Sequence, residues 1–354
     1  MERVAITDGS GNVVSTIQIV DGATALSRGE LLLPGDLSRH RVGVIVQPSV
    51  TRIASAIEDS WRDRGASVRT ITVPDREAAK TLSVAEDCFV QLNELGLTRD
   101  DMIVGIGGGA ATDLAGFVAA TYLRGVASVL FPTTMLAAVD ASIGGKTAVN
   151  VGGKNLVGVF HHPDRVIIDL EILRGLPREI LLEGSAEAVK AGFIADPDLV
   201  ALYAADGLSA NIADVLVRAV RVKAGIVSED FRERGVRGTL NFGHTVGHAI
   251  ETLTGLSHGH SVAIGMVAAS YSSAKQLGFP ETPAVVEILQ KLGLPTVLPA
   301  GVSRSDILEL IRLDKKRDHG GIRMALLSRI GECVVMSVDD ATVLVGLTAI
   351  GVTN

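Results

Sequence analysis

Strand-like and helix-like segments alternate through the first half of this chain, and that alternation limits its fold more than any other feature. Stretches with helical spacing lie at residues 49–63 and 77–95, and another begins near residue 110. Because strands without a polar face need cover on both sides, the pattern predicts a parallel sheet between two layers of helices. The apolar runs that suit its strands are Val42–Val46, Val68–Val73, Met102–Ile106, Ser128–Phe131 and Val166–Asp169.

The segments on either side of this alternation have different patterns. Before residue 35, the alternating residues Thr16–Val20 predict an added hairpin. After about residue 177 helical spacing dominates, with one short strand pair at 324–327 and 332–336. We therefore expect an α/β domain over residues 1–177 and a helical domain over residues 178–354. The helices expected in the second domain are Glu179–Ala195, Leu199–Ala205, Ile212–Val227, Thr245–Leu253, Val262–Leu277, Pro283–Leu292 and Ser305–Leu313.

Charge and composition exclude several classes of protein. The 354 residues include 33 basic and 40 acidic side chains, and the formal charge of −7 argues against a nucleic-acid or polybasic membrane surface. The hydrophobic content of 47% supports a large core and excludes disorder. Two cysteines, Cys88 and Cys333, allow neither a disulfide framework nor a four-cysteine zinc site.

The sequence has no pattern typical of export or membrane insertion. Its first residues lack the apolar core of a signal peptide. The most apolar stretch, residues 114–139, is interrupted by Arg124 and Pro132. We therefore expect a cytoplasmic protein with reduced cysteines.

A glycine-rich turn follows the third predicted strand. In Gly105–Gly109, the bare backbone can approach a phosphate, and the start of the next helix favours an anion. The usual dinucleotide fingerprint has an acid about 20 residues further on. Here Asp113 comes four residues after Gly109, so an ordinary tight turn remains an alternative.

A second polar segment is rich in hydrogen-bond donors. It contains Thr133 and Thr134, then residues 140–147 and 153–155. Hydroxyls, amides and two lysines among glycines supply donors without bulk, which suits a phosphate or a carboxylate. A solvated loop with surface lysines is the alternative, although the flanking residues are apolar.

Glu187 and Lys190 stand three positions apart in a run of small apolar residues. On a helix they share one face. A surface ion pair would contribute less than about 1 kcal/mol and would need no further explanation. The apolar surroundings instead predict a buried pair, and burial favours a functional one.

Histidines cluster in the second half of the chain. His244, His248, His258 and His260 are four of its eight histidines. Because His244 and His248 are four residues apart, a helix places them on one face with the spacing of metal ligands. Adding His258 or His260, and Glu187 as an oxygen ligand, would complete a metal site with positions open for substrate. Purely structural histidines are the alternative.

Together these residues resemble the 3-dehydroquinate synthase family of sugar phosphate cyclases. The resemblance extends from about residue 70 to 330, and the combination is far more specific than any one motif. Its motifs are the triple glycine with Asp113, Tyr122–Gly125, Pro132–Thr134, Val139–Thr147, Gly153–Gly158, Ala186–Glu187 with Lys190, Leu240–His248 and Asp314–Lys316.

The resemblance implies a fold, two cofactors and a reaction. The fold is an α/β N-terminal Rossmann-like domain with a parallel sheet, which binds NAD, plus an all-α C-terminal domain that binds metal and substrate. One Zn²⁺ or Co²⁺ per subunit and a homodimer are also implied, without a nucleic-acid or membrane partner. The substrate is a small anionic sugar phosphate, 3-deoxy-D-arabino-heptulosonate 7-phosphate. Transient oxidation by NAD, phosphate elimination, reduction and aldol closure convert it to 3-dehydroquinate in the shikimate pathway.

Motif matching assigns the metal ligands to Glu187, His244 and His258. The family pattern is His-Gly-Glu-x-Val-x-x-Gly-Met, which aligns with His258 and leaves His260 at the usual Glu position. The interval between His244 and His258 is shorter than in the family, which predicts a trimmed turn.

The resemblance also assigns contacts to substrate and NAD. Asp140 and Glu233 would bind hydroxyls or set the charge of lysines. Residues implied for the substrate carboxylate and hydroxyls are Lys146, Lys190, Lys223 and Arg237. Residues implied for the phosphate are Asn155, Asn241, His248, Lys315 and Arg124, with a partner subunit as an alternative source of the arginine. Residues implied for NAD are Glu77, Lys80, Gly107, Gly108, Gly109, Asp113, Thr133, Thr134, Asp140, Lys146 and Lys154.

Two departures from the family and three rival functions accompany this assignment. Gln47 replaces an Asp or Asn after the first strand, and Arg178-Glu179 comes one position early. A sister cyclase that makes an aminodehydroquinate or a valiolone is the first rival, although Asn241 and His248, which valiolone enzymes change, are retained. An iron-type alcohol or glycerol dehydrogenase and an inactive paralogue fit less well, because the anion-binding set is complete.

Overall fold

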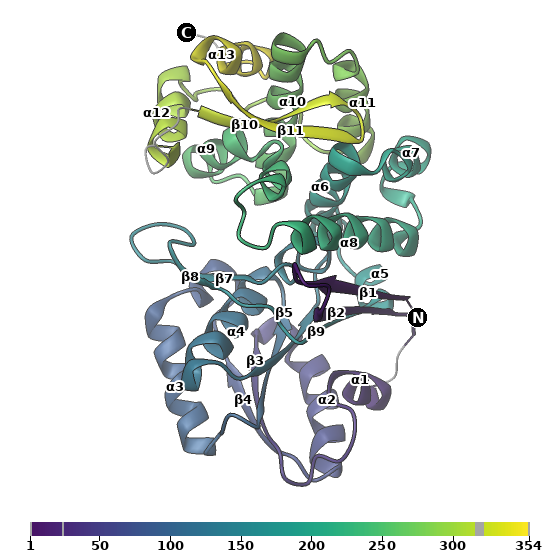
Figure 1. Ribbon diagram of the computed structural model, residues 1–354, viewed down its shortest axis with the longest axis vertical. Coiled ribbons are helices and arrows are strands. Elements are labelled where there is room, and N and C mark those ends of the chain that lie inside the picture. Colours follow the sequence, from purple (N-terminus) through teal and green to yellow (C-terminus); the bar gives the residue numbers. More distant parts are fainter. Residues whose placement is uncertain (1, 23–24, 316–321, 353–354) are drawn as a thin grey trace. The chain divides into compact units, whose positions relative to one another are not determined.

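Two units of similar length make up the chain, residues 1–176 and 177–354. The computed structural model describes residues 2–22, 25–315 and 322–352, and Figure 1 labels its elements. The side chains of residues 25–27 and 314–315 lie outside the described part.

A seven-stranded sheet forms the centre of the first unit. Its strands are β1 (Glu2–Thr7), β2 (Val13–Val20), β3 (Arg41–Val46), β4 (Ser67–Thr72), β5 (Met102–Gly107), β6 (Ala127–Pro132) and β9 (Arg165–Asp169). Their order is β1-β2-β9-β6-β5-β3-β4. Only β1 and β2 pair antiparallel within this sheet. The predicted parallel sheet and its added hairpin are therefore confirmed.

Helices cover both faces of this sheet. Val44 shares a core with Trp61 of α2 on one face, and α1 packs beside it. Gly43 points to the other face, where a Cβ atom would clash with Leu92 of α3. Glycine at this position therefore lets the helix approach the strand backbone closely. The helices are α1 (Ala25–Leu32), α2 (Thr51–Asp63), α3 (Leu82–Leu95), α4 (Gly109–Thr121) and α5 (Leu170–Arg174).

One predicted helix of the first unit is interrupted. The spacing predicts a single helix over residues 77–95, whereas the structure has a short 3₁₀ turn, η2 (Arg76–Ala79), followed by α3. The Oγ1 atom of Thr81 accepts a hydrogen bond from the N–H of Val84 at 3.2 Å. This cap starts a new helix at Leu82 and leaves the preceding turn to place Glu77 and Lys80.

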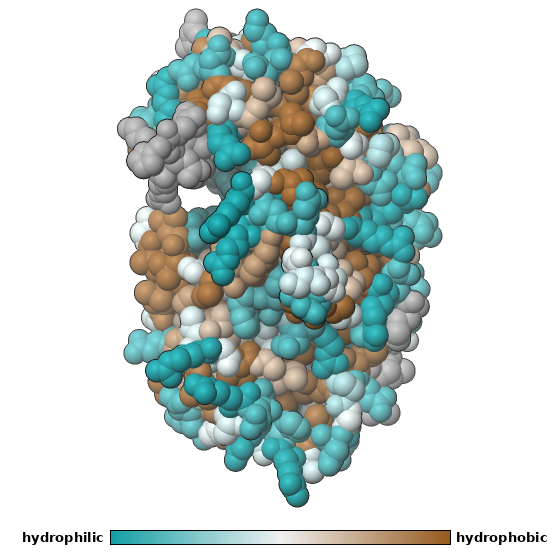
Figure 2. Space-filling model, viewed as in Figure 1, coloured by the Kyte–Doolittle hydropathy of each residue, from teal (hydrophilic) through white to brown (hydrophobic). Residues whose placement is uncertain are grey.

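A small hairpin that the sequence did not predict follows β6 in the same unit. Its strands β7 (Lys146–Val149) and β8 (Val157–Phe160) pair antiparallel. Val151, Leu156 and Val159 on this hairpin are exposed, and hydrophobic surface gathers over it in Figure 2. Exposed apolar clusters of this kind are typical of contact surfaces.

Helices make up most of the second unit, as predicted. They are α6 (Arg178–Ala195), α7 (Pro197–Asp206), α8 (Ile212–Glu229), α9 (His244–Thr254), α10 (His258–Leu277), α11 (Thr282–Leu292), α12 (Arg304–Lys315) and α13 (Asp340–Ala349). The predicted strand pair is present as β10 (Ile322–Arg329) and β11 (Glu332–Val338), and β10 packs against α10. Among the described helices, none has the length and apolar character that a bilayer span needs.

The close crossing of α9 and α10 organises the second unit. A Cβ atom on Gly265 would clash with the carbonyl oxygen of Gly243, and one on Gly247 would lie 3.0 Å from the carbonyl oxygen of Ser261. Glycine at both positions allows the two backbones to touch. As a result, the rings of His244 and His258, the first residues of α9 and α10, have centroids 5.3 Å apart.

Candidate functional site

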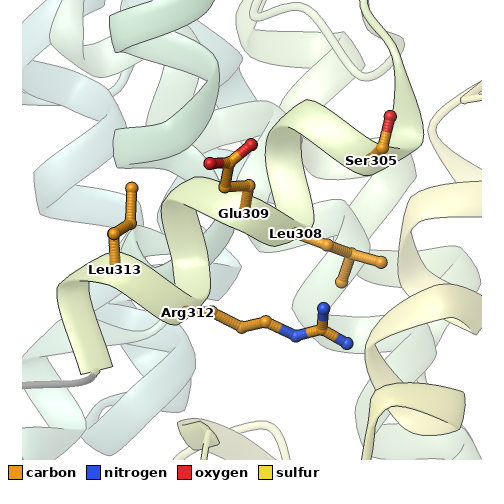
Figure 3. A pocket seen from close by; sticks show the side chains of 5 residues that line it. All are labelled: Ser305, Leu308, Glu309, Arg312 and Leu313. Carbon is orange, nitrogen blue, oxygen red and sulfur yellow. The ribbon is translucent and has the colours of Figure 1, made fainter.

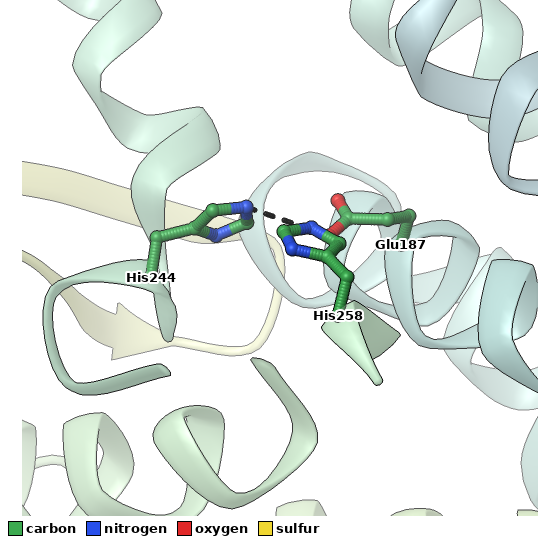
Figure 4. Close-up of side chains that lie close together, drawn as sticks. All are labelled: Glu187, His244 and His258. Atoms are coloured by element: carbon green, nitrogen blue, oxygen red, sulfur yellow. Dashed lines mark hydrogen bonds and ion pairs between the residues drawn. The ribbon is translucent and has the colours of Figure 1, made fainter. Parts of the chain in front are cut away.

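Three side chains from three helices converge in the second unit. Glu187 comes from α6, His244 begins α9 and His258 begins α10. The Nε2 atoms of His244 and His258 lie 3.4 Å and 3.2 Å from the same carboxylate oxygen, Oε1 of Glu187. Figure 4 shows the three side chains pointing toward one another, and their ligand atoms all lie within 4.8 Å.

Hydrogen bonds at the opposite ring nitrogens orient both histidines. The Nδ1 atom of His244 lies 3.3 Å from the carbonyl oxygen of Phe242. The Nδ1 atom of His258 lies 3.1 Å from Oε2 of Glu251 on α9. Because a carbonyl and a carboxylate only accept, each Nδ1 donates its proton outward, and each Nε2 faces Glu187, where a metal ion would replace any proton on it.

Charge in this group is unevenly distributed. Although burial opposes ionisation, the Lys190 ammonium beside Glu187 holds the pKa of that carboxyl well below its usual range. Burial and Lys190 lower the pKa of His244 well below its ordinary value, so its ring is neutral. Burial by itself would lower the pKa of His258, but Glu187 and Glu251 raise it to about 9.

These donor atoms fit a divalent metal ion. One carboxylate oxygen and two imidazole nitrogens form the His₂Glu ligand set of catalytic zinc sites, which keep further positions open. Each histidine has the outer hydrogen bond that metal-binding histidines normally make. The predicted burial of Glu187 with Lys190 is confirmed, since the two side chains are 1% and 3% exposed.

The other two histidines of the cluster lie outside this ligand group. The ring of His248 stands edge-on to that of His244, with centroids 5.1 Å apart, and His248 is exposed. His260 is half-buried and is not among the three grouped residues. Helical spacing therefore identified His248 as a neighbour of His244, whereas the packing of α6 and α10 against α9 brings Glu187 and His258 to it.

Buried cationic side chains accompany the ligand group in the second unit. Lys190, Lys223 and Arg237 are 3%, 7% and 2% exposed. The Asp230 carboxylate accepts hydrogen bonds from the N–H groups of Arg234, Gly235 and Arg237 at 2.7–3.1 Å. It thereby folds the segment that leads into the 3₁₀ turn η6 (Val236–Asn241).

Three predicted site residues have strained backbones. Among the described residues other than glycine, φ is positive at Arg124 (67°), Asn155 (59°) and Glu233 (56°), and at Arg76 and Leu123. The Oε1 atom of Glu233 accepts a hydrogen bond from Nδ2 of Asn241 at 2.9 Å. Strain of this kind is typical of binding sites, because the surrounding structure must hold the residue in place.

The glycine turn of the first unit lies where the sheet reverses its strand order. Strand β4 lies beyond β3 on one side, and β6 and β9 lie beyond β5 on the other. Ligands of open parallel sheets bind at such a point, beyond the carboxyl ends of the strands. Gln47 follows β3, and its Oε1 atom accepts a hydrogen bond from the N–H of Gly108 at 3.0 Å. Thr133 follows β6, and its N–H donates to the carbonyl oxygen of Gly107 at 2.9 Å.

A second buried lysine organises the predicted NAD residues. Lys80 is 2% exposed, and its Nζ atom lies 2.5 Å from Oδ2 of Asp113 and also donates to Oδ1 of Asn155. Asn150 connects the same loop to Glu77, because its side chain donates to Glu77 and accepts from the N–H of Asn155, both at 2.8 Å. Residues assigned to NAD and a residue assigned to phosphate thus form one network.

The remaining predicted site residues lie on several separate elements. Thr134 accepts a hydrogen bond from the N–H of Ala137 at 3.2 Å, where a π-helical turn, η4 (Ala137–Ala141), carries Asp140. Lys146 and Lys154 are exposed on and beside the β7–β8 hairpin. Lys315 ends α12, but its side chain lies outside the described part.

Sequence reasoning missed Glu251, Gln47 and Asn150 as contributors to these clusters. Glu251 lies seven residues after His244, two helical turns along the same face, which was an available signal. Gln47 was noted only as a departure from the family. Asn150 had no signal, because its role depends on two loops that meet in space.

A separate pocket of about 430 Å³ runs along α12. Figure 3 shows its lining side chains, which all project from this one helix. None of them is a predicted site residue, and Arg312 is paired with Asp340. The lining residues of this pocket are Ser305, Leu308, Glu309, Arg312 and Leu313.

The fold is shared with a sugar phosphate cyclase of known structure. That structure is 2-deoxy-scyllo-inosose synthase complexed with carbaglucose-6-phosphate, NAD+ and Co2+. The likeness has a TM-score of 0.85 and 26% sequence identity, and covers 98% of this chain and 100% of the other. Fold and buried ligand group together define an enzyme of the cyclase class.

Sequence comparison narrows the class to one family. A family model described as 3-dehydroquinate synthase N-terminal matches residues 70–183, and one described as 3-dehydroquinate synthase C-terminal matches residues 184–317. A 3-dehydroquinate synthase of Corynebacterium efficiens is 42% identical over 306 residues, 82% of this chain and 83% of the relative. One of Thermobifida fusca is 42% identical over 342 residues, 93% and 92% of the two chains. The chain belongs to the 3-dehydroquinate synthase family.

Proposed function

We propose that this chain is a 3-dehydroquinate synthase, a carbon–oxygen lyase that converts 3-deoxy-D-arabino-heptulosonate 7-phosphate to 3-dehydroquinate and phosphate. The observation that carries the proposal is the buried group of Glu187, His244 and His258 with Lys190 beside it. Identity of 42% to synthases over most of their length supports the same reaction.

The metal centre in this proposal is a Zn²⁺ or Co²⁺ ion held by Glu187, His244 and His258. When bound, such an ion polarises a hydroxyl or ketone oxygen and makes its proton easier to remove. The protein contributes orientation, since Phe242 and Glu251 hold the histidine rings with Nε2 toward Glu187. The Co2+ in the related inosose synthase supports this assignment.

NAD binding is assigned to the first unit. When bound, NAD would take a hydride from the substrate carbon that bears a hydroxyl, while the hydroxyl loses its proton, and would later return the hydride, so that the reaction has no net oxidation. Gln47 already occupies the N–H of Gly108. The N–H groups of Gly109 and Ala110, the first in α4, are of the kind that a helix start presents to a pyrophosphate. The other NAD contacts that we assign are Glu77, Lys80, Gly107, Asp113, Thr133, Thr134, Asp140, Lys146 and Lys154.

Substrate recognition is assigned to cationic and amide side chains. Lys190, Lys223 and Arg237 would bind the carboxylate and hydroxyls, and their burial strengthens the attraction, because water screens it less. Elimination then needs orientation more than a dedicated base, because the phosphate of the substrate can itself accept the proton in this family. Further contacts that we assign are Lys146, Glu233 and Asp140 to the hydroxyls or neighbouring lysines, and Arg124, Asn155, Asn241, His248 and Lys315 to the phosphate.

We also infer a cytoplasmic homodimer without a nucleic-acid or membrane partner. The exposed apolar residues of the β7–β8 hairpin support a contact with a second copy. A net charge of −7 disfavours long polyanions, while a few buried cations still suit a small anionic substrate.

The proposal is tested by incubating metal-loaded protein and NAD with the heptulosonate phosphate. We expect release of inorganic phosphate with a product of the mass of 3-dehydroquinate, no accumulation of NADH, and no turnover after removal of the metal. Turnover of sedoheptulose 7-phosphate in its place would overturn the proposal in favour of a sister cyclase, a candidate kept open by the likeness to inosose synthase. Net NADH formation from simple alcohols would indicate a dehydrogenase.

A further inference from the structure

Carboxylates contact both ring nitrogens of His258. Glu187 from α6 lies 3.2 Å from Nε2, and Glu251 from α9 lies 3.1 Å from Nδ1. The other histidine of the group differs, because Nδ1 of His244 faces only the neutral carbonyl oxygen of Phe242. His258 is therefore the ligand candidate whose outer partner carries a full negative charge.

Local structure holds Glu251 and His258 in this arrangement. Three residues, 255–257, connect the end of α9 to the start of α10. Gly255 has a φ of 69°, a left-handed conformation that suits glycine and reverses the chain within this short link. The two side chains are 21% and 20% exposed, so their charge-assisted hydrogen bond is only partly screened by water.

We propose that Glu251 is a positioning residue for the metal, a role that rests on the metal site of the proposed function. By accepting the proton of Nδ1, its carboxylate fixes the ring of His258 so that the lone pair of Nε2 points toward Glu187 and His244. Its negative charge also makes Nε2 a stronger ligand. Glu251 does not contact the metal in this role, and it acts only through His258.

The test compares the affinity for Co²⁺ of three variants, measured by competition with a chromogenic chelator. Glu251→Ala removes the acceptor and should weaken binding about 10- to 100-fold, which is the usual effect of losing an outer partner of a metal ligand. Glu251→Gln keeps an amide oxygen that can accept the same hydrogen bond, so its loss should be smaller. Glu287→Gln removes an exposed charge on α11 and should match the parent protein.

The visible absorption spectrum of bound Co²⁺ provides a second measurement that a merely structural role would not change. We expect a shifted spectrum for Glu251→Ala and a near-parent spectrum for Glu251→Gln. Parent-like affinity and spectrum in both Glu251 variants would overturn the role of Glu251. Failure of the parent protein itself to bind Co²⁺ would instead refute the metal site. If Glu251→Ala fails to fold, Glu251→Gln alone decides: a loss of Co²⁺ affinity in that variant is then required, and parent-like affinity overturns the role.

Discussion

Each unit contains a buried lysine beside a helical carboxylate, and the two pairs differ in their surroundings. In the first unit, the ammonium of Lys80 lies between Asp113 and Asn155, two acceptors that it satisfies directly. In the second unit, Lys190 donates to Oε2 of Glu187. The other oxygen faces the Nε2 atoms of two histidines.

This difference separates a structural clamp, the group of Lys80, Asp113 and Asn155, from a ligand site, the group of Glu187, His244 and His258. The Lys80 cluster matches donors to acceptors and ties the loop of Asn155 to the turn of Glu77 through Asn150. The Glu187 cluster gathers one carboxylate oxygen and two imidazole nitrogens within 4.8 Å, a set of atoms that suits a divalent metal ion. A buried lysine alone therefore does not indicate a metal site, whereas two imidazole nitrogens that converge on the same carboxylate do.

The largest effect that we predict concerns the ligand histidines. His258→Ala should weaken metal binding about 1000-fold or more, about 4 kcal/mol, because a ligand is lost outright. His260→Ala should leave metal content close to that of the parent, since His260 is not in the ligand group. Metal content after dialysis measures both. The reverse result would transfer the third ligand to His260.

The next effect concerns the clamp. Lys80→Met should lower the free energy of unfolding by about 3 kcal/mol, because it leaves the carboxylate of Asp113 without its buried partner. Urea unfolding monitored by circular dichroism measures the loss. Lys275→Met, at an exposed lysine of α10, is the matched control and should change stability by less than about 0.5 kcal/mol. Equal stability of both variants would contradict the clamp.

The smallest effect is a pH dependence of the same clamp. Burial raises the pKa of Asp113 to about 6, against the opposing influence of Lys80. The folded chain therefore binds more protons than the unfolded chain between about pH 4 and pH 6, and stability falls as pH rises through this window. We expect a loss of about 1–2 kcal/mol, less than the full shift implies, because the side chain is partly exposed.

Asp113→Asn provides the comparison for this pH effect, because its amide oxygen can still accept from Lys80 but does not titrate. Urea unfolding at several pH values should show a flatter curve for the variant between pH 4 and pH 6. Since all other groups titrate in both proteins, the difference between the curves isolates Asp113. Parallel curves would show that Asp113 titrates at an ordinary pKa.

Much of the fold could be predicted because strong patterns allow few structures. Apolar runs such as Val42–Val46 fit only a strand covered on both faces, and helical spacing with small residues fits α10. The β7–β8 hairpin was missed, because strands of four residues carry little periodic signal, and Gly158 weakens the pattern of β8 further. The break before α3 was missed as well, because one threonine cap decided it.

The sequence by itself determined the family, the spacing of its histidines and the residue types of the site. The family motif assigned His244 and His258 to Glu187, but helical spacing could not, because it relates residues only along one helix. That choice depends on α6, α9 and α10, which meet where glycines let their backbones touch. Likewise Lys80 meets Asp113 and Asn155 across 33 and 75 positions of chain, a contact that only the tertiary structure creates.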